Sequence, residues 1–192
     1  MPKKLYKTID SHIHCGIQHV HQPYAEISTL LEAADIEAAC MFAPVEDIYD
    51  RYSGHFTDTV EWQQCRTRAN NYLKQLAQNH PVFPYFFVWN DFAVNQLTAD
   101  FKGIKWHRHA NEPHYNYHDP ACEVFLQRVY QRQLPIVLEE EFRHTLDMTT
   151  RIAGRTILII PHLGRLYRKT NSFPVFPIVV IFNILITHKK IN

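Results

Sequence analysis

Short apolar runs alternate with segments of helical spacing along most of this 192-residue chain. The runs predict six β-strands, because each is five to seven residues long and is bounded by turn or polar residues. Between them, apolar residues recur at helical spacing, and Asp119-Pro120 supplies an N-cap followed by proline at the first helical position. This order favours an α/β fold with parallel strands and right-handed crossovers. The expected strands are 5–9, 38–43, 82–88, 101–106, 134–139 and 156–160, and the expected helices are 24–34, 60–78, 94–100, 120–132 and 145–153.

The pattern changes after residue 164. Residues 165–192 carry an apolar run, 172–186, that has two prolines near its start and Asn183 inside it. The run is shorter than the roughly 18 uninterrupted apolar residues expected of a membrane span, so we expect no membrane association. We divide the chain into a domain at 1–164 and an atypical apolar tail at 165–192, of the kind that a frame change near 164–167 would produce. A seventh strand is the alternative, which its β-branched residues favour.

Polar side chains stand at the ends of four expected strands. His12 and His14 follow the first run, and residues at i and i+2 of an extended segment point to the same face. Imidazole is a ligand suited to zinc and similar ions. Lys105, Glu139 and His162 also follow apolar runs, where an isolated polar group is costly unless it is paired or ligated. We therefore expect these five side chains to converge on a metal at the carboxyl ends of parallel strands.

In these residues and the motifs around them, the chain resembles the amidohydrolase superfamily, in the branch that also contains metal-dependent decarboxylases. The resemblance covers residues 5–164 and rests on Asp10-x-His12-x-His14, Gly103-Ile104-Lys105, the 134–138 strand and Ile160-Pro161-His162-Leu163-Gly164. It implies a (β/α)8 TIM-barrel fold, here incomplete with about six βα units, because such barrels usually need about 250 residues. The family's strand-eight aspartate has no counterpart in this chain.

The resemblance also implies a mononuclear or binuclear site for a divalent metal. His12, His14, Glu139 and His162 would be the ligands, with Glu139 standing where the family commonly has a histidine. His162 would be a ligand or a catalytic base, and Lys105 lies on the strand where some members carry a carboxylated lysine. Zinc is the expected metal, with manganese or iron as alternatives.

The function that follows is hydrolysis of an amide, ester or lactone in a small molecule through metal-activated water, with His162 and Lys105 as catalytic residues. A metal-dependent decarboxylase and a catalytically inactive incomplete barrel remain alternatives, as does a non-enzymatic module tethered to a membrane by the tail. Lys105, His107 or Arg108 would bind a substrate anion. Tyr115 and Tyr117 would line its pocket or simply pack.

Composition and charge limit the partners and the cellular location that we expect. The net charge of +1 gives no electrostatic reason to expect nucleic acid as a partner, and no signal-peptide pattern follows Lys3 and Lys4. Four widely spaced cysteines favour reduced thiols in a cytoplasmic protein, and a homo-oligomer stays open. Of the 13 histidines, we expect those in the 107–118 stretch to form a solvated loop. Of Glu139, Glu140 and Glu141, we expect one to be a metal ligand and the others to be solvated or paired with Arg143.

Overall fold

One parallel sheet organises the part of the chain that the computed structural model describes, residues 7–109 and 111–161. Its six strands run in the order β1-β4-β5-β6-β7-β8, and a short antiparallel pair, β2-β3, follows β1. Apart from that pair, strands adjacent in sequence are adjacent in the sheet, which is the winding of a (β/α)8 barrel. The bounds are β1 Ile9–His14, β2 Gly16–Ile17, β3 His21–Gln22, β4 Ala38–Phe42, β5 Val82–Phe87, β6 Gly103–His107, β7 Ile136–Glu139 and β8 Leu158–Ile159.

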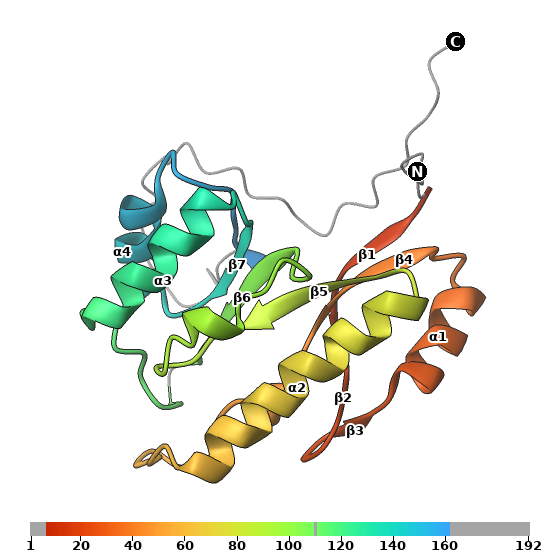
Figure 1. Cartoon of the computed structure of the whole chain (residues 1–192), viewed down its shortest axis with the longest axis horizontal. Helices are drawn as coiled ribbons and strands as arrows, with labels where there is room; N and C mark the ends of the chain where they lie inside the picture. The colour runs from red at the N-terminus through yellow and green to blue at the C-terminus, as the bar shows by residue number, and fades with distance from the viewer. Residues whose placement is uncertain (1–6, 110, 162–192) are drawn as a thin grey trace, which may run out of the picture.

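Helices cover the outer face of the sheet. Helix α2 packs along β5 and β4, whereas α3 and α4 lie on the β6–β7 side, as Figure 1 shows. The Thr59 hydroxyl accepts the first capping bond of α2, and the Asp119 carboxylate does so for α3, just before Pro120. The helices are α1 Tyr24–Ala33, α2 Val60–Asn79, α3 Pro120–Gln131 and α4 Phe142–Ile152, and the 3₁₀ turns are η1 Val45–Asp47 and η2 Val94–Gln96.

Successive side chains along each strand point to opposite faces of the sheet, and each face has its own hydrophobic core. Ile104 and Trp106 of β6 belong to the large core between sheet and helices. A smaller cluster on the inner face contains Phe42, Tyr85 and Val137, one residue from each of three strands. Residues two apart share a face, so β6 and β7 also present their polar positions inward, above this apolar layer.

Gly103 makes the inner layer fit. A Cβ atom at this position would lie 2.1 Å from Cε1 of Tyr85, so only glycine leaves room for the tyrosine ring. The ring packs edge-on against Phe42 with centroids 5.0 Å apart. The base of the half-barrel is therefore filled by side chains, as in complete barrels.

The predicted incomplete barrel is confirmed, with differences in detail. The first strand is Ile9–His14 rather than 5–9, so both histidines lie within β1 instead of following it. The expected helix at 94–100 is only the single 3₁₀ turn η2. The reason for the first difference is that β1 turns polar residues toward the barrel interior, which removes the apolar run that would mark a strand. The division at residue 164 and the tail lie outside the described residues.

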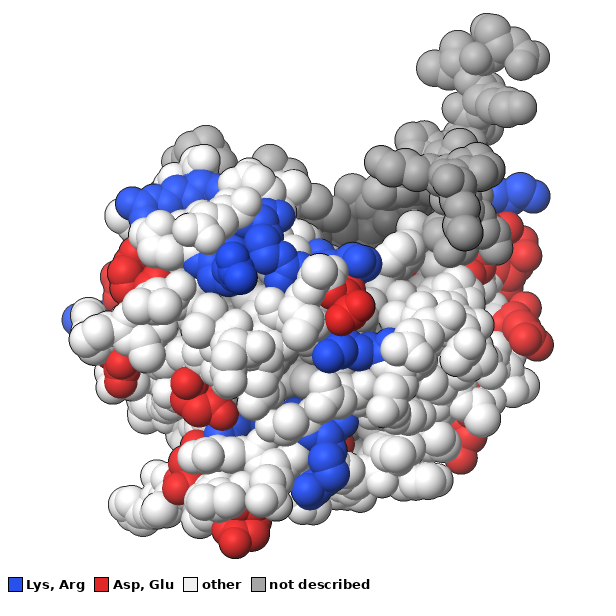
Figure 2. All heavy atoms as spheres, viewed as in Figure 1, with Lys and Arg blue, Asp and Glu red and all other residues white. Residues whose placement is uncertain are grey.

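The surface carries both signs of charge. Figure 2 shows lysine, arginine, aspartate and glutamate side chains distributed over the visible face. Within the described residues, no helix has the length and apolar character needed to cross a membrane. All four cysteines are free thiols, three of them buried.

Candidate active site

Lys105 lies at the centre of the polar cluster on the inner face. Its side chain is completely buried, and its Nζ lies 3.1 Å from His12 Nε2 and 3.3 Å from Glu139 Oε2. The ammonium also stands 5.0 Å from the centroid of the Phe42 ring. Strands β1, β6 and β7 thus bring together three of the residues expected from the sequence.

Glu139, the last residue of β7, connects Lys105 to two further histidines. Its Oε2 lies 3.5 Å from His107 Nε2, and its Oε1 lies 3.3 Å from His109 Nε2. His107 is nearly fully buried, and burial is the main reason why its pKa lies below the ordinary value. Glu139 therefore accepts contacts from a cation and two imidazoles at once.

His14 lies beside His12 and is held by the backbone. The two rings are 5.4 Å apart between centroids, on one side of β1, as their spacing predicts. Nδ1 of His14 lies 2.8 Å from the Ala43 carbonyl oxygen, to which it donates when protonated. Burial, with the nearby Lys105 charge, lowers the pKa of His14 to about 4. The imidazole is therefore neutral near pH 7, and its Nε2 keeps the lone pair that a metal ligand requires.

The donor atoms fit a divalent metal. Suitable ligand atoms of His107, His109 and Glu139 all lie within 4.8 Å of one another. His12 Nε2 and Glu139 Oε2 come from different strands, and both contact the positively charged ammonium group of Lys105. Their donor atoms therefore already surround one cationic group. Nδ1 of His107 is buried without a hydrogen-bond partner in the described ranges, 7–109 and 111–161. Imidazole and carboxylate are the donors that zinc takes from proteins outside cysteine sites.

Arg108 pairs with the two glutamates that follow Glu139 and is therefore not available to a substrate anion. Its guanidinium is completely buried and lies 2.8 Å from Glu140 and 2.5 Å from Glu141. Glu140 and Glu141 were expected to be solvated or paired with Arg143, and the structure pairs them with Arg108 instead. Tyr117 donates its hydroxyl to Glu140 at 3.0 Å, and Tyr115 donates to the Val88 carbonyl at 2.9 Å. The two tyrosines are therefore structural.

Tyr49 and Arg51 hold the loop that follows β6. The Tyr49 hydroxyl lies 2.7 Å from Glu112 Oε2 and 3.0 Å from the His107 carbonyl oxygen, and these two acceptors share its one proton. Arg51 forms an ion pair with the same Glu112 carboxylate. These contacts fix the position of His107 and His109 relative to β7.

Sequence reasoning offered His107 as an anion-binding residue or as part of a solvated loop, and missed its contact with Glu139. The expected solvated loop is wrong for His107, which is the last residue of β6 and buried, but His114 and His118 are exposed as expected. The alternation along β6 could have identified His107. Ile104 and Trp106 face the helices, so Gly103, Lys105 and His107 face inward, and the strand ends one residue after Trp106. His162, the remaining expected ligand, lies outside the described residues.

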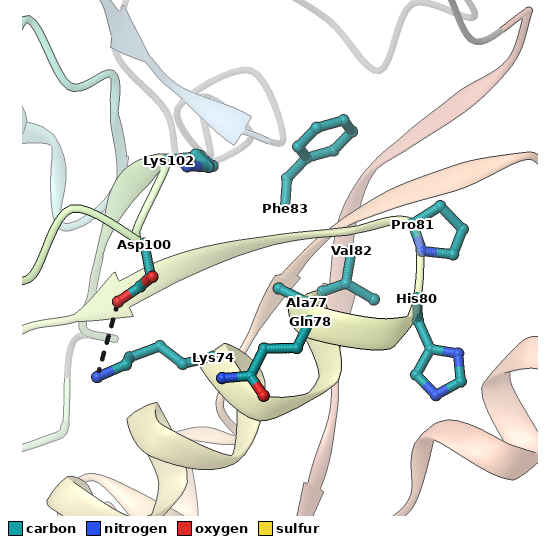
Figure 3. A pocket seen from close by; sticks show the side chains of 9 residues that line it. All are labelled: Lys74, Ala77, Gln78, His80, Pro81, Val82, Phe83, Asp100 and Lys102. Carbon is teal, nitrogen blue, oxygen red and sulfur yellow. Dashed lines mark ion pairs between the residues drawn. The ribbon is translucent and has the colours of Figure 1, made fainter. Parts of the chain in front are cut away.

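A separate pocket lies at the opposite end of the sheet. It has a volume of about 290 Å³ and opens near the start of β5, where Lys74 and Asp100 form an ion pair at 3.9 Å (Figure 3). The polar cluster described above is at the carboxyl ends of the strands, whereas this pocket is at their amino ends. Because chemistry in parallel barrels is carried by the carboxyl ends, we do not assign the reaction to this pocket.

Comparisons with known proteins find likeness in solved structures only. No protein-family model and no curated protein matches the chain. Two solved structures assigned as 2-pyrone-4,6-dicarboxylic acid hydrolases share the fold. The one from Pseudomonas putida has a TM-score of 0.59 at 12% identity, over 83% of this chain and 58% of its own. The one from Acinetobacter baumannii, with citric acid bound, has a TM-score of 0.55 at 14% identity, over 83% and 59%.

A third structure is 2,6-dihydroxybenzoate decarboxylase from Rhizobium. Its TM-score is 0.53 at 12% identity, and the match covers 91% of this chain and 75% of the decarboxylase. These likenesses confirm the fold, an incomplete (β/α)8-type barrel. The chain spans less than two thirds of the two hydrolases, so part of their barrels has no counterpart in the match.

Proposed function

We propose that this protein is a metal-dependent hydrolase that cleaves a carbonyl bond (an amide, ester or lactone) in a small carboxylated molecule. The observation that carries the proposal is the convergence of His12, Lys105 and Glu139 within hydrogen-bond distance on the inner face of the sheet. Three strands contribute one residue each: Glu139 ends β7, and His12 and Lys105 lie two residues before the ends of β1 and β6. Barrel enzymes hold their reacting groups at this end of the sheet.

The ligands we propose are His12, His14, Glu139 and His162, and zinc is the metal that this donor set favours. A bound divalent ion supplies a nucleophilic water at neutral pH and polarises the substrate carbonyl. His14 stays neutral at neutral pH because it is buried, and the Ala43 carbonyl fixes its orientation. His107 orients the Glu139 carboxylate from the neighbouring strand.

Lys105 is the residue we propose to bind the substrate. Its ammonium provides positive charge inside a largely dry site, where a carboxylate or a developing oxyanion is stabilised strongly. His162 is proposed as the base or as a positioning group for the same oxygen. A carboxylated substrate agrees with the neighbours, whose names specify a pyrone dicarboxylic acid and a dihydroxybenzoate.

The first experiment measures metal content per chain by elemental analysis, with wild type and the His12→Ala/His14→Ala variant. We expect the double variant to lose one equivalent of divalent metal relative to wild type. A matched control is His114→Ala/His118→Ala, which removes two exposed histidines and should keep the full content. Equal metal content in wild type and the first variant, with both folded, would exclude the proposed ligands.

Activity is tested with one substrate of each reaction type. Ring opening of 2-pyrone-4,6-dicarboxylate reports hydrolysis, and release of carbon dioxide from 2,6-dihydroxybenzoate reports decarboxylation. We expect hydrolysis, and a loss of about 100-fold in kcat for Lys105→Met, the typical cost of removing one preorganised oxyanion donor. Metal-loaded wild type without turnover of either substrate would favour the inactive incomplete barrel.

Decarboxylation is the second candidate. It is favoured by the Rhizobium decarboxylase, which matches a larger share of this chain, 91%, than either hydrolase does. In that reaction Lys105 would hold the carboxylate of an aromatic acid while the ring receives a proton. Release of carbon dioxide from 2,6-dihydroxybenzoate, without ring opening of 2-pyrone-4,6-dicarboxylate, would identify the protein as a decarboxylase. The reaction would take place in the cytoplasm, the location we propose for the protein.

A further inference from the structure

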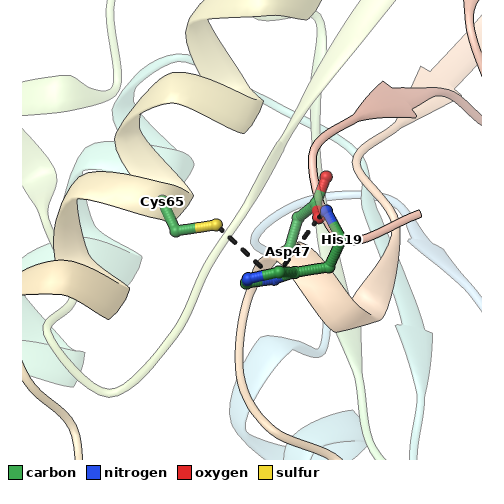
Figure 4. Close-up of side chains that lie close together, drawn as sticks. All are labelled: His19, Asp47 and Cys65. Carbon is green, nitrogen blue, oxygen red and sulfur yellow. Dashed lines mark hydrogen bonds and ion pairs between the residues drawn. The ribbon is translucent and has the colours of Figure 1, made fainter. Parts of the chain in front are cut away.

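A second group of metal-type donors lies outside the site described above. His19, Asp47 and Cys65 come from three elements: the β2–β3 turn, the end of η1, and α2 (Figure 4). Ligand atoms of all three lie within 4.8 Å of one another. We propose that this cluster is a separate binding site for a thiophilic divalent cation such as Zn²⁺, distinct from the metal site of the proposed hydrolase.

The geometry favours a metal ligand set over a catalytic triad. Nδ1 of His19 lies 3.8 Å from Cys65 Sγ and 3.7 Å from Asp47 Oδ1. In a nucleophile–base–acid triad the imidazole uses different nitrogens for its two partners. Here both partners face the same nitrogen, so a proton cannot pass from the thiol across the ring to the carboxylate. The same Nδ1 lies 2.8 Å from the Glu46 carbonyl oxygen, to which it donates in the metal-free chain. A cation that binds this nitrogen replaces the proton of that hydrogen bond and can contact both Cys65 and Asp47.

The distances are close to those of a zinc centre. Tetrahedral coordination at standard bond lengths puts nitrogen and sulfur about 3.5 Å apart and nitrogen and oxygen about 3.3 Å apart. The distances in the protein, 3.8 Å and 3.7 Å, exceed these values by only a few tenths of an ångström. Small side-chain rotations bring all three atoms to a common ion.

Asp47 supplies an independent observation that favours binding of a cation. Its side chain is completely buried, and burial raises the pKa of its carboxyl. One oxygen, Oδ2, lacks a hydrogen-bond partner among the described residues, and within them the only ion-pair partner of Asp47 is His19. A buried carboxylate without a permanent positive partner is costly, and a divalent ion would remove that cost.

The surroundings hold the ligands and leave a path for an ion. The His19 backbone N–H donates to Asp47 Oδ1 at 2.8 Å, and the His19 ring packs against Trp62 with centroids 5.0 Å apart. Gln18 donates to the Cys65 carbonyl at 3.0 Å. The His19 side chain is 53% exposed, so an ion enters from its side. Thiolate, imidazole and carboxylate together select zinc-like ions over magnesium or calcium.

Cobalt distinguishes this site from the hydrolase site. The proposed ligands of the hydrolase site contain no sulfur, so a thiolate-to-cobalt charge-transfer band reports only on Cys65. The full chain is stripped with a chelator and titrated with Co²⁺, and Zn²⁺ is then added to displace the cobalt. We expect the band in wild type, its loss on addition of one equivalent of Zn²⁺ at this site, and its absence from Cys65→Ala.

Matched variants separate ligation from unspecific effects. Cys122→Ala removes another buried helical thiol, and His21→Ala removes the neighbouring exposed histidine, so both should retain the band. His19→Ala should weaken Co²⁺ binding by at least about 10-fold, the lower limit for losing even an outer-shell partner. No band in folded wild type, or a band that persists in Cys65→Ala, would overturn the proposal. Since His12→Ala/His14→Ala leaves Cys65 intact, that variant should keep the band even if the hydrolase site fails.

Discussion

Lys105 and Glu139 form a buried ion pair across the neighbouring strands β6 and β7, with Nζ 3.3 Å from Oε2. The lysine is completely buried and the glutamate is 6% exposed. The pair places a positive and a negative charge at the inner mouth of the half-barrel. His12 contacts the lysine, and His107 and His109 contact the glutamate.

Removing one partner of this pair should destabilise the fold. Lys105→Met leaves Glu139 charged and buried, and such losses cost about 3–5 kcal/mol. We expect a decrease of about 3 kcal/mol in the free energy of unfolding, measured by urea denaturation. The comparison is Lys74→Met, which breaks the ion pair with Asp100 at the protein surface and should cost less than about 1 kcal/mol. Similar losses in the two variants would contradict the buried character of the first pair.

His14 should make stability depend on pH in the metal-free protein. Its pKa is about 4 in the folded state and 6.5 ordinarily, so the unfolded chain binds the extra proton between these values. Stability due to this group is therefore present above pH 6.5 and is lost as pH falls toward 4, by about 3 kcal/mol. The measurement is the free energy of unfolding at pH 7 and pH 4.5 in the presence of chelator.

The matched variants for this effect are His14→Asn and His114→Asn. Asparagine at 14 can still donate to the Ala43 carbonyl but does not titrate, so the variant should lose much of the pH dependence. His114 is exposed, and its replacement should leave the dependence unchanged. If His14→Asn and wild type lose the same stability on acidification, burial does not control the protonation of His14.

Gly103 is required by the packing of Tyr85. Alanine at 103 would place Cβ 2.1 Å from the tyrosine ring, and the ring belongs to the inner core, so strands or ring must move. We expect a loss of about 1–3 kcal/mol, the usual cost of overpacking. Gly54 is the control, because an added Cβ meets no atom within 4 Å there. Thermal unfolding of Gly103→Ala, Gly54→Ala and Gly103→Ala/Tyr85→Val measures the effect, and the double variant should recover part of the loss.

The elements that the sequence predicted well are those whose apolar residues pack into the large core between the sheet and the helices. Helix α2 was expected at 60–78 and spans Val60–Asn79, and α3 begins at Pro120 because Asp119 caps it. Local signals suffice for these elements, since capping residues and apolar spacing mark both their ends and their buried face.

The errors occur where burial depends on distant strands. In β1 the inner positions carry polar residues, so a strand that is partly buried does not read as an apolar run. The pairing of Arg108 with Glu140 and Glu141 joins residues more than thirty positions apart, and nothing in the local pattern distinguishes Arg108 from Arg143 as the partner. The convergence of His12, Lys105 and Glu139 was foreseen because parallel strands bring their carboxyl ends together.

His107 offers the sharpest test of the active site, because sequence reasoning placed it in a solvated loop or against a substrate anion and the structure buries it beside Glu139. If it positions Glu139, His107→Gln should weaken Zn²⁺ binding at the hydrolase site by about 10–100-fold, the typical cost of losing an outer-shell partner. Binding is measured by competition with a chromophoric chelator in the Cys65→Ala background, which removes the second proposed site. His118→Gln, an exposed replacement in the following loop, should bind as tightly as the background. Unchanged zinc affinity in His107→Gln would mean that His107 does not position Glu139.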